Sequence, residues 1–134
     1  MPLSEQEAAK MRELVSGFFD AVGAGDIEAV KNYYDDDLVV WHNFDNAEQT
    51  KAENIASLAS IPDRLRDRVY ANRQVEVFEG GFVQQHVLIA TRIFDGARIE
   101  MPAIIICRVR NGKIIRLDEY LDSAHVAELR KVAP

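Results

Sequence analysis

Glycine-containing turn sequences divide the second half of the chain into segments with a two-residue hydrophobic period. The turns are Gly80-Gly81, Asp95-Gly96 and Asn111-Gly112, and the last two are typical of tight β-hairpins. The alternation of apolar and polar residues between them indicates strands that each bury one face. We therefore predict four antiparallel strands over residues 69–78, 82–94, 98–110 and 113–121, with Pro102 at a bulge or a sheet edge.

The first half of the chain has a helical period instead. Ser4, with Glu7 three residues later, matches a capping box, and the apolar residues that follow recur at helical spacing until Gly23 and Gly25. Asp26 is expected to cap a second, short helix. The remaining expectations are a turn at Asp35-Asp36-Asp37, a strand over 38–44, a polar loop over 45–50, a helix over about 49–60 that stops at 61–63, and a helical turn capped by Asp122 or Ser123 that runs through Leu129.

This order of elements predicts a single α+β domain over residues 1–134. The expected architecture is a cone-shaped, strongly curved mixed or antiparallel sheet with three helices packed over its concave face. The interior of such a cone is a natural ligand cavity.

Composition excludes several kinds of partner. The net charge is −6 and the pI is near 5.0, whereas nucleic acids and anionic membranes require a surplus of Lys and Arg on one face. Cys107 is the single cysteine, so no intrachain disulfide is possible. The first residues lack the pattern of a signal peptide, and no apolar run approaches the roughly 20 residues of a membrane span. We expect a cytoplasmic protein that binds neither nucleic acid nor membrane.

Strand parity predicts which polar side chains face the interior. In the predicted strands, the face that is largely apolar also carries His42, Glu119, His86 and Arg92. An unpaired polar group in apolar surroundings is unfavourable, so a ligand site is one explanation for these side chains. The structural alternatives are a hydrogen-bonded core histidine at His42 and a half-buried strand residue near the end of the sheet at His86. Glu119 could instead pair with Arg92 or emerge at the rim of the cone.

The layout and several motifs resemble the nuclear transport factor 2-like superfamily, and within it the SnoaL-like and ketosteroid-isomerase-like branch. The resemblance covers about residues 5–128. It is carried by the segments at residues 19–26 and 34–37, by Trp41-His42-Asn43, and by residues 112–115 running into 118–122. By resemblance, we expect a small apolar ligand in the cone and a homodimer formed through the outer face of the sheet.

The catalytic residues of this branch carry over in part. The position of the ketosteroid isomerase base looks like His42, but the two oxyanion-hole positions look like Phe18 and Ile105, which cannot donate hydrogen bonds. Glu119 resembles the acid/base carboxylate that SnoaL-like cyclases carry on the last strand. Two positions of the limonene-epoxide-hydrolase triad look like Leu88 and Ala90, so that triad is absent.

Two classes of function remain open from the sequence. The first is an enzyme without a cofactor that uses His42 and Glu119 for isomerisation, cyclisation, dehydration or hydrolysis of a polyketide-, terpenoid- or steroid-like carbonyl compound. The second is a non-catalytic binding or assembly module of the same fold. No metal is expected, because His42 and Glu119 are too few ligands for zinc, and Cys107 is expected to be a buried, inert thiol. The predicted substrate-binding residues are Phe18, Tyr33, Phe44, Ile55, Leu58, His86, Leu88, Ala90, Arg92, Met101, Ala103, Ile105 and Leu117.

Overall fold

The computed structural model describes residues 2–134, in which six strands form one mixed sheet with the order β2-β1-β6-β5-β4-β3. The predicted meander is confirmed, since β3 to β6 pair with their neighbours in antiparallel fashion. β1 lies parallel to β6, and the short β2 pairs with β1. The strands are β1 Tyr34–His42, β2 Glu48–Thr50, β3 Leu65–Phe78, β4 Gly81–Arg92, β5 Arg98–Arg110 and β6 Lys113–Leu121.

The helices begin at side-chain caps that the sequence supplies. Ser4 and Asp26 accept hydrogen bonds from backbone N–H groups three residues later, as predicted, and Thr50 and Glu53 form a complete capping box. The first helix ends at Gly25, whose φ of 71° suits a residue without a Cβ. The helices are α1 Glu5–Ala24, α2 Ile27–Tyr33, α3 Lys51–Ser60 and α4 Ser123–Arg130, with a 3-10 turn η1 at Ile61–Asp63.

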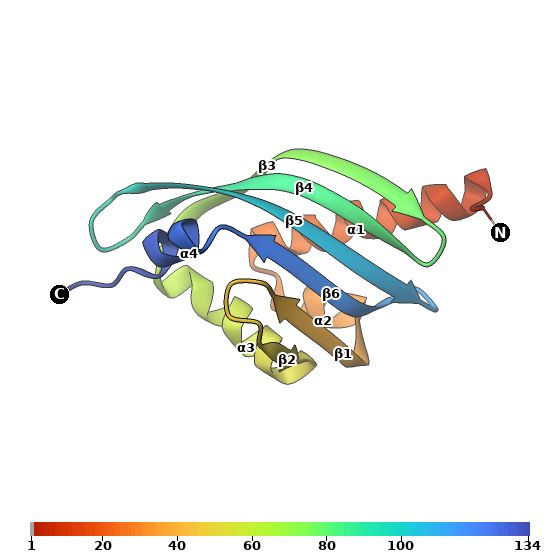
Figure 1. Ribbon diagram of the computed structural model, residues 1–134, viewed down its shortest axis with the longest axis horizontal. Coiled ribbons are helices and arrows are strands. Elements are labelled where there is room, and N and C mark those ends of the chain that lie inside the picture. Colours follow the sequence, from red (N-terminus) through yellow and green to blue (C-terminus); the bar gives the residue numbers. More distant parts are fainter. Residues whose placement is uncertain (1) are drawn as a thin grey trace.

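Figure 1 shows the sheet bent along its long strands, with α1, α2 and α3 on its concave side and α4 at the end of β6. The sheet is curved and remains open, in agreement with the predicted cone. Two irregularities in β3 contribute to the bend, at Asp67 and Asn72, where the pairing with β4 shifts and φ is 55° and 56°. The sequence placed the start of this strand at residue 69, because a polar segment with a bulge does not show a clean two-residue period.

Four local predictions were wrong. The three aspartates at residues 35–37 lie in β1 rather than in a turn, because β1 already pairs with β6 at Tyr34. β1 ends at His42, before the predicted residue 44, and residues 48–50, expected to be loop, form β2. At the second hairpin, β4 ends at Arg92, and Ile93 and Phe94 belong to the loop.

The first hairpin turn also differs from its prediction. Its two loop residues are Glu79 and Gly80, because Phe78 already pairs with Gly81. Gly81 lies in β4, where a Cβ would be 2.1 Å from the carbonyl oxygen of Cys107. This glycine therefore permits close approach of two strands. At the third turn both Asn111 and Gly112 have positive φ, as a type I′ hairpin requires.

The apolar interior has two parts. α1 and α2 cover one end of the sheet, where Phe18, Phe19 and Phe82 are at most 1% exposed. The other end is covered by η1 and α4, and its cluster centres on Leu88, Met101 and other smaller residues. The second part lies beside the candidate site.

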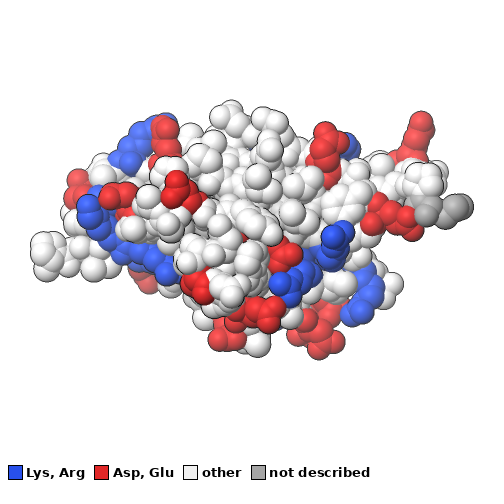
Figure 2. Space-filling model, in the orientation of Figure 1, with Lys and Arg blue, Asp and Glu red and all other residues white. Residues whose placement is uncertain are grey.

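The outer face of the central strands is poor in charge. Figure 2 shows an uncharged area over these strands, with Lys, Arg, Asp and Glu gathered around it. The paired residues Ile104 and Tyr120 lie in this sheet and are 39% and 44% exposed.

Pro102 lies one residue beyond the last pair between β5 and β6, so its missing N–H falls where β6 has ended. No helix within residues 2–134 has the length and hydropathy needed to cross a membrane.

Candidate active site

His42 and Glu119 form a pair on the concave face of the sheet. They are register partners on the parallel strands β1 and β6, and Nε2 of His42 lies 3.0 Å from Oε1 of Glu119. Their side chains are 17% and 18% exposed, so the pair is partly shielded but still reachable. The sequence placed both side chains on inward faces, and the pairing of β1 with β6 brings them together.

The end of β1 is fixed by hydrogen bonds around this pair. The N–H of Asn43 donates to the carbonyl of Glu119, and its side-chain oxygen accepts from the N–H of Leu121 at 2.7 Å. A turn closes when Asn46 N–H donates to the His42 carbonyl and the indole N–H of Trp41 donates to Asn46 Oδ1. The backbone that carries His42 is therefore held on both sides, which limits the movement of its ring.

A cavity of about 170 Å³ borders the pair, between the concave face and the covering elements α3, η1 and α4. A second cavity of about 70 Å³ lies deeper, towards α1. His42, Asn54, Leu58, Tyr70 and Glu119 line both, so the pair stands where the two spaces meet. Apolar walls come mainly from Leu58, Leu88 and Met101, and the mouth includes Phe44, whose ring centroid is 5.4 Å from that of His42.

Most of the predicted substrate-binding residues border one of these cavities. Those that do are Phe18, Phe44, Leu58, His86, Leu88, Met101, Ile105 and Leu117. Tyr33, Ile55, Ala90, Arg92 and Ala103 do not. Tyr33 packs its hydroxyl against Gly17, where an added Cβ would be 2.0 Å away, and Ile55 borders a separate surface groove. Ala90 and Ala103 are packed in the core.

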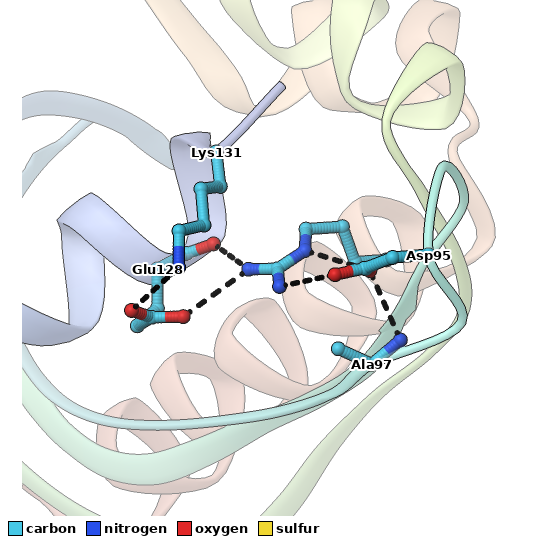
Figure 3. Close-up of polar contacts among 5 residues, drawn as sticks. Asp95, Ala97, Glu128 and Lys131 are labelled. Carbon is cyan, nitrogen blue, oxygen red and sulfur yellow. Dashed lines mark hydrogen bonds and ion pairs between the residues drawn. The ribbon is translucent and has the colours of Figure 1, made fainter. Parts of the chain in front are cut away.

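Arg92 has a structural role that its inward position did not reveal. Its guanidinium donates to both carboxylate oxygens of Asp95 and to the backbone carbonyl and carboxylate of Glu128. These bonds raise the pKa of Arg92 and hold the pKa of Asp95 down at about 2. Figure 3 shows how the network joins Asp95 in the β4–β5 hairpin to Glu128 and Lys131 at the end of the chain. The arginine thus fixes α4 over the cavity.

Sequence reasoning missed the polar residues Asn54 and Tyr70, which line both cavities. Asn54 is 6% exposed; its Oδ1 accepts a hydrogen bond from the Tyr34 hydroxyl at 2.8 Å and its Nδ2 donates to Gln49. Asn54 stands four residues before Leu58 on the inner side of α3, and a polar residue at that spacing is a usable signal. The second is Tyr70, whose hydroxyl-bearing ring lies 5.0 Å from the His86 ring on the cavity wall. It lies in β3 between the two irregularities, where strand parity gives no reliable face.

His86 is held by Gln84, two residues earlier on the same face of β4. The side-chain amide of Gln84 lies 2.9 Å from Nδ1 of His86 and donates to it, so the hydrogen of a neutral ring is on Nε2. Burial lowers the pKa of His86, although the nearby charge of Glu119 opposes this shift. The imidazole is therefore neutral near pH 7 and carries an N–H donor in the cavity wall.

The negative charge of Glu119 affects the pKa values of three buried residues in the interior. Burial raises the pKa of Tyr70 to about 12 and also raises the pKa values of Tyr34 and Cys107, and the charge of Glu119 adds to each of these shifts. Both phenols stay protonated, and the Cys107 thiol, fully buried, does not form the thiolate that nucleophilic attack requires. Within residues 2–134, no three His, Cys, Asp or Glu side chains are grouped as metal ligands.

Solved structures with this fold are numerous but distant in sequence. A Bacillus subtilis protein provisionally named an isomerase is 16% identical, with 95% of each chain covered and a TM-score of 0.78. A Shewanella denitrificans protein provisionally named a SnoaL-like polyketide cyclase is 12% identical, with 89% of this chain and 95% of that chain covered and a TM-score of 0.78. A Catenulispora acidiphila protein with a ketosteroid-isomerase-like fold, in complex with trimethylamine, is 13% identical over 87% of this chain and 91% of that chain, with a TM-score of 0.76. At these identities the likeness establishes the fold alone.

Among curated proteins, none matches the sequence significantly. The SnoaL-like domain family, however, matches residues 15–117, which include the second half of α1, the strand β1 with His42 and most of the meander. This match covers more than half of the chain and agrees with the observed architecture. The chain therefore belongs to the SnoaL-like domain family.

Proposed function

We propose that this protein is an enzyme that catalyses proton transfer on a small, largely apolar carbonyl compound, with His42 and Glu119 as its acid–base pair. The observation that carries the proposal is the 3.0 Å contact between the two side chains at the junction of two cavities. A binding module has no need to place an imidazole and a carboxylate in direct contact in its ligand cavity. The reaction class is isomerisation, cyclisation, dehydration or hydrolysis.

In this proposal His42 transfers the proton and Glu119 supports it. Nε2–H of His42 donates to the Glu119 carboxylate, which leaves the lone pair on Nδ1 to take a proton from a carbon beside the carbonyl group. Glu119 orients the ring and stabilises the imidazolium that forms, as the carboxylate does in a catalytic triad. The same imidazolium then returns the proton to another atom of the substrate, which completes an isomerisation.

His86 would polarise the substrate carbonyl. The positions expected to form an oxyanion hole are Phe18 and Ile105, which line the deeper cavity and have no donor. The Nε2–H of His86 borders the main cavity, and within residues 2–134 no acceptor binds it. A neutral donor of this kind stabilises negative charge on the substrate oxygen without transferring its own proton.

The cavity favours a ligand with one ring inside. An apolar cavity of about 150 Å³ is enough for benzene, so a space of about 170 Å³ takes a single six-membered ring. Polyketide-, terpenoid- or steroid-like compounds of several rings would extend through the mouth. We also propose that the uncharged outer face of the sheet, with Ile104 and Tyr120, forms a homodimer interface.

The proposal can be tested by proton exchange, which requires no knowledge of the natural substrate. Ring ketones such as cyclohexanone and 1,3-cyclohexanedione are incubated with the protein in D₂O, and deuterium uptake next to the carbonyl is followed by NMR. We expect the protein to accelerate exchange and the variants His42→Gln and Glu119→Gln to lose at least about 100-fold of that acceleration.

His125→Gln is the matched control, because it removes a histidine of α4 that does not border either cavity. It should exchange at the wild-type rate. Exchange that is no faster with the protein than with buffer for every ketone, or full activity in folded His42→Gln, would overturn the assignment and leave a binding module as the function.

A further inference from the structure

Two arginines at the mouth of the main cavity have no neutralising partner in the described part of the chain. Arg64 and Arg130 both border this cavity, and within residues 2–134 neither guanidinium forms an ion pair or a hydrogen bond. Elsewhere in this acidic chain, arginines such as Arg73 and Arg116 are paired with carboxylates. An unpaired guanidinium at the entrance of a cavity is a recognition group for an anion.

Both arginines are mounted on fixed backbone. The N–H of Arg64 donates to the Ile61 carbonyl, and its carbonyl accepts from Ile93 N–H in the β4–β5 hairpin, each at 2.9 Å. Arg130 ends α4, the helix that Arg92 holds through Glu128. The Arg130 guanidinium lies 4.8 Å above the centroid of the Phe44 ring, a stacking contact that keeps it at the mouth.

The charges inside the cavity determine the orientation of an anion. The Glu119 carboxylate lies at the inner end, so a ligand carboxylate there would be repelled. Asp45 is the other acid of the lining, and it is exposed with Oδ1 accepting from Ala47 N–H. Negative charge on a ligand is therefore favourable only beside the two arginines, with the apolar part of the ligand directed towards His42.

We infer that the cavity binds a monocyclic carboxylic acid, whose carboxylate pairs with Arg64 and Arg130 while its ring occupies the space beside His42 and Glu119. This inference rests on the proposed function only in taking the cavity as a small-molecule site. It names the substrate class: a ring compound with a carboxylate at one end and the reacting carbonyl group at the other.

Binding of neutral and anionic probes of the same shape tests the inference. The probes are benzoate, phenylacetate and 3-phenylpropanoate, each compared with its amide, and dissociation constants are measured by NMR titration of the full chain. At least one acid should bind about tenfold tighter than its amide, and the double variant Arg64→Gln/Arg130→Gln should remove that preference while amide binding is unchanged. Arg98→Gln, which removes an exposed arginine paired with Glu100 elsewhere on the surface, should keep it.

The inference is overturned if the amides bind as tightly as the acids, if the double variant keeps the preference, or if no acid binds saturably. Glu119→Gln separates this test from the proposed function, because it should abolish proton exchange while acid binding stays equal or becomes tighter. Acid preference without any exchange would reject the catalytic proposal alone. Exchange that depends on His42, without acid preference, would reject the carboxylate inference alone.

Discussion

The two ends of the concave face use the same sheet in opposite ways. Beneath α1 and α2, Val15, Phe18, Phe19 and Phe82 are at most 1% exposed, and the aromatic rings pack edge to face. Beneath η1 and α4, residues such as Phe44 and Leu129 are only half-buried and surround a cavity with a polar pair. The long amphipathic helix α1 leaves only a cavity of about 70 Å³ at one end, whereas the short covering elements leave about 170 Å³ at the other. The difference indicates that the tightly packed core and the candidate site occupy separate ends of one layer.

The largest expected effect comes from removing an aromatic ring at the filled end. Phe19→Ala should lower the free energy of unfolding by about 3–5 kcal/mol, because the ring is fully buried and its removal enlarges the empty space beneath α1. Leu58→Ala, which removes a smaller and only half-buried side chain, should cost only about 2 kcal/mol. Urea denaturation followed by circular dichroism measures both values. Equal losses would show that the two ends contribute alike, against the comparison.

A second experiment asks whether the polar pair is kept at the expense of stability. The double variant His42→Leu/Glu119→Met replaces two partly buried polar groups by apolar groups of similar size, so the free energy of unfolding should stay equal or rise by up to about 2 kcal/mol. The single variant Glu119→Met leaves His42 without its partner and should therefore be less stable than the double variant. Thermal unfolding of the wild type and both variants measures these differences. A clear loss of stability in the double variant would mean that the pair is structural.

The smallest effect concerns the ion-pair network that holds α4. The pKa of Asp95 is lowered to about 2 by its hydrogen bonds from Arg92, and the pKa of Glu128 is lowered by the same guanidinium. Because these carboxylates have lower pKa values in the folded state, their contribution is complete above about pH 4 and is lost as the pH falls towards about 2.

Amide exchange of Val126 in α4 should therefore accelerate between pH 4 and 2 more than intrinsic exchange predicts, while amides beneath α1 should not respond. In Asp95→Asn the α4 amides should be fast already at neutral pH, and much of the acid dependence should disappear. If α4 and α1 respond together, the cover of the cavity is not an independently held element.

Much of the fold could be read from local patterns. The limits of β5 and β6 match their predicted ranges, because Gly96 and the Asn111-Gly112 turn fix the strand ends and the two-residue period is clean between them. The start of β3 and the short β2 could not be read, since a bulged or three-residue strand has no period to detect. In the candidate site, parity identified His42, Glu119 and His86. It also proposed Arg92, which faces inward but meets Asp95 and Glu128 instead of the cavity.

The amino-acid sequence by itself determined most of the elements and the faces of side chains in the regular strands, because these depend on neighbours a few residues apart. Only the tertiary structure decided that β1 runs parallel to β6, so that His42 and Glu119, distant in the sequence, stand at 3.0 Å. It also decided which end of the sheet is tightly packed and which keeps the larger cavity. Both outcomes depend on non-local strand pairing and on which helix covers which strands, and a local pattern of residues carries no information about either.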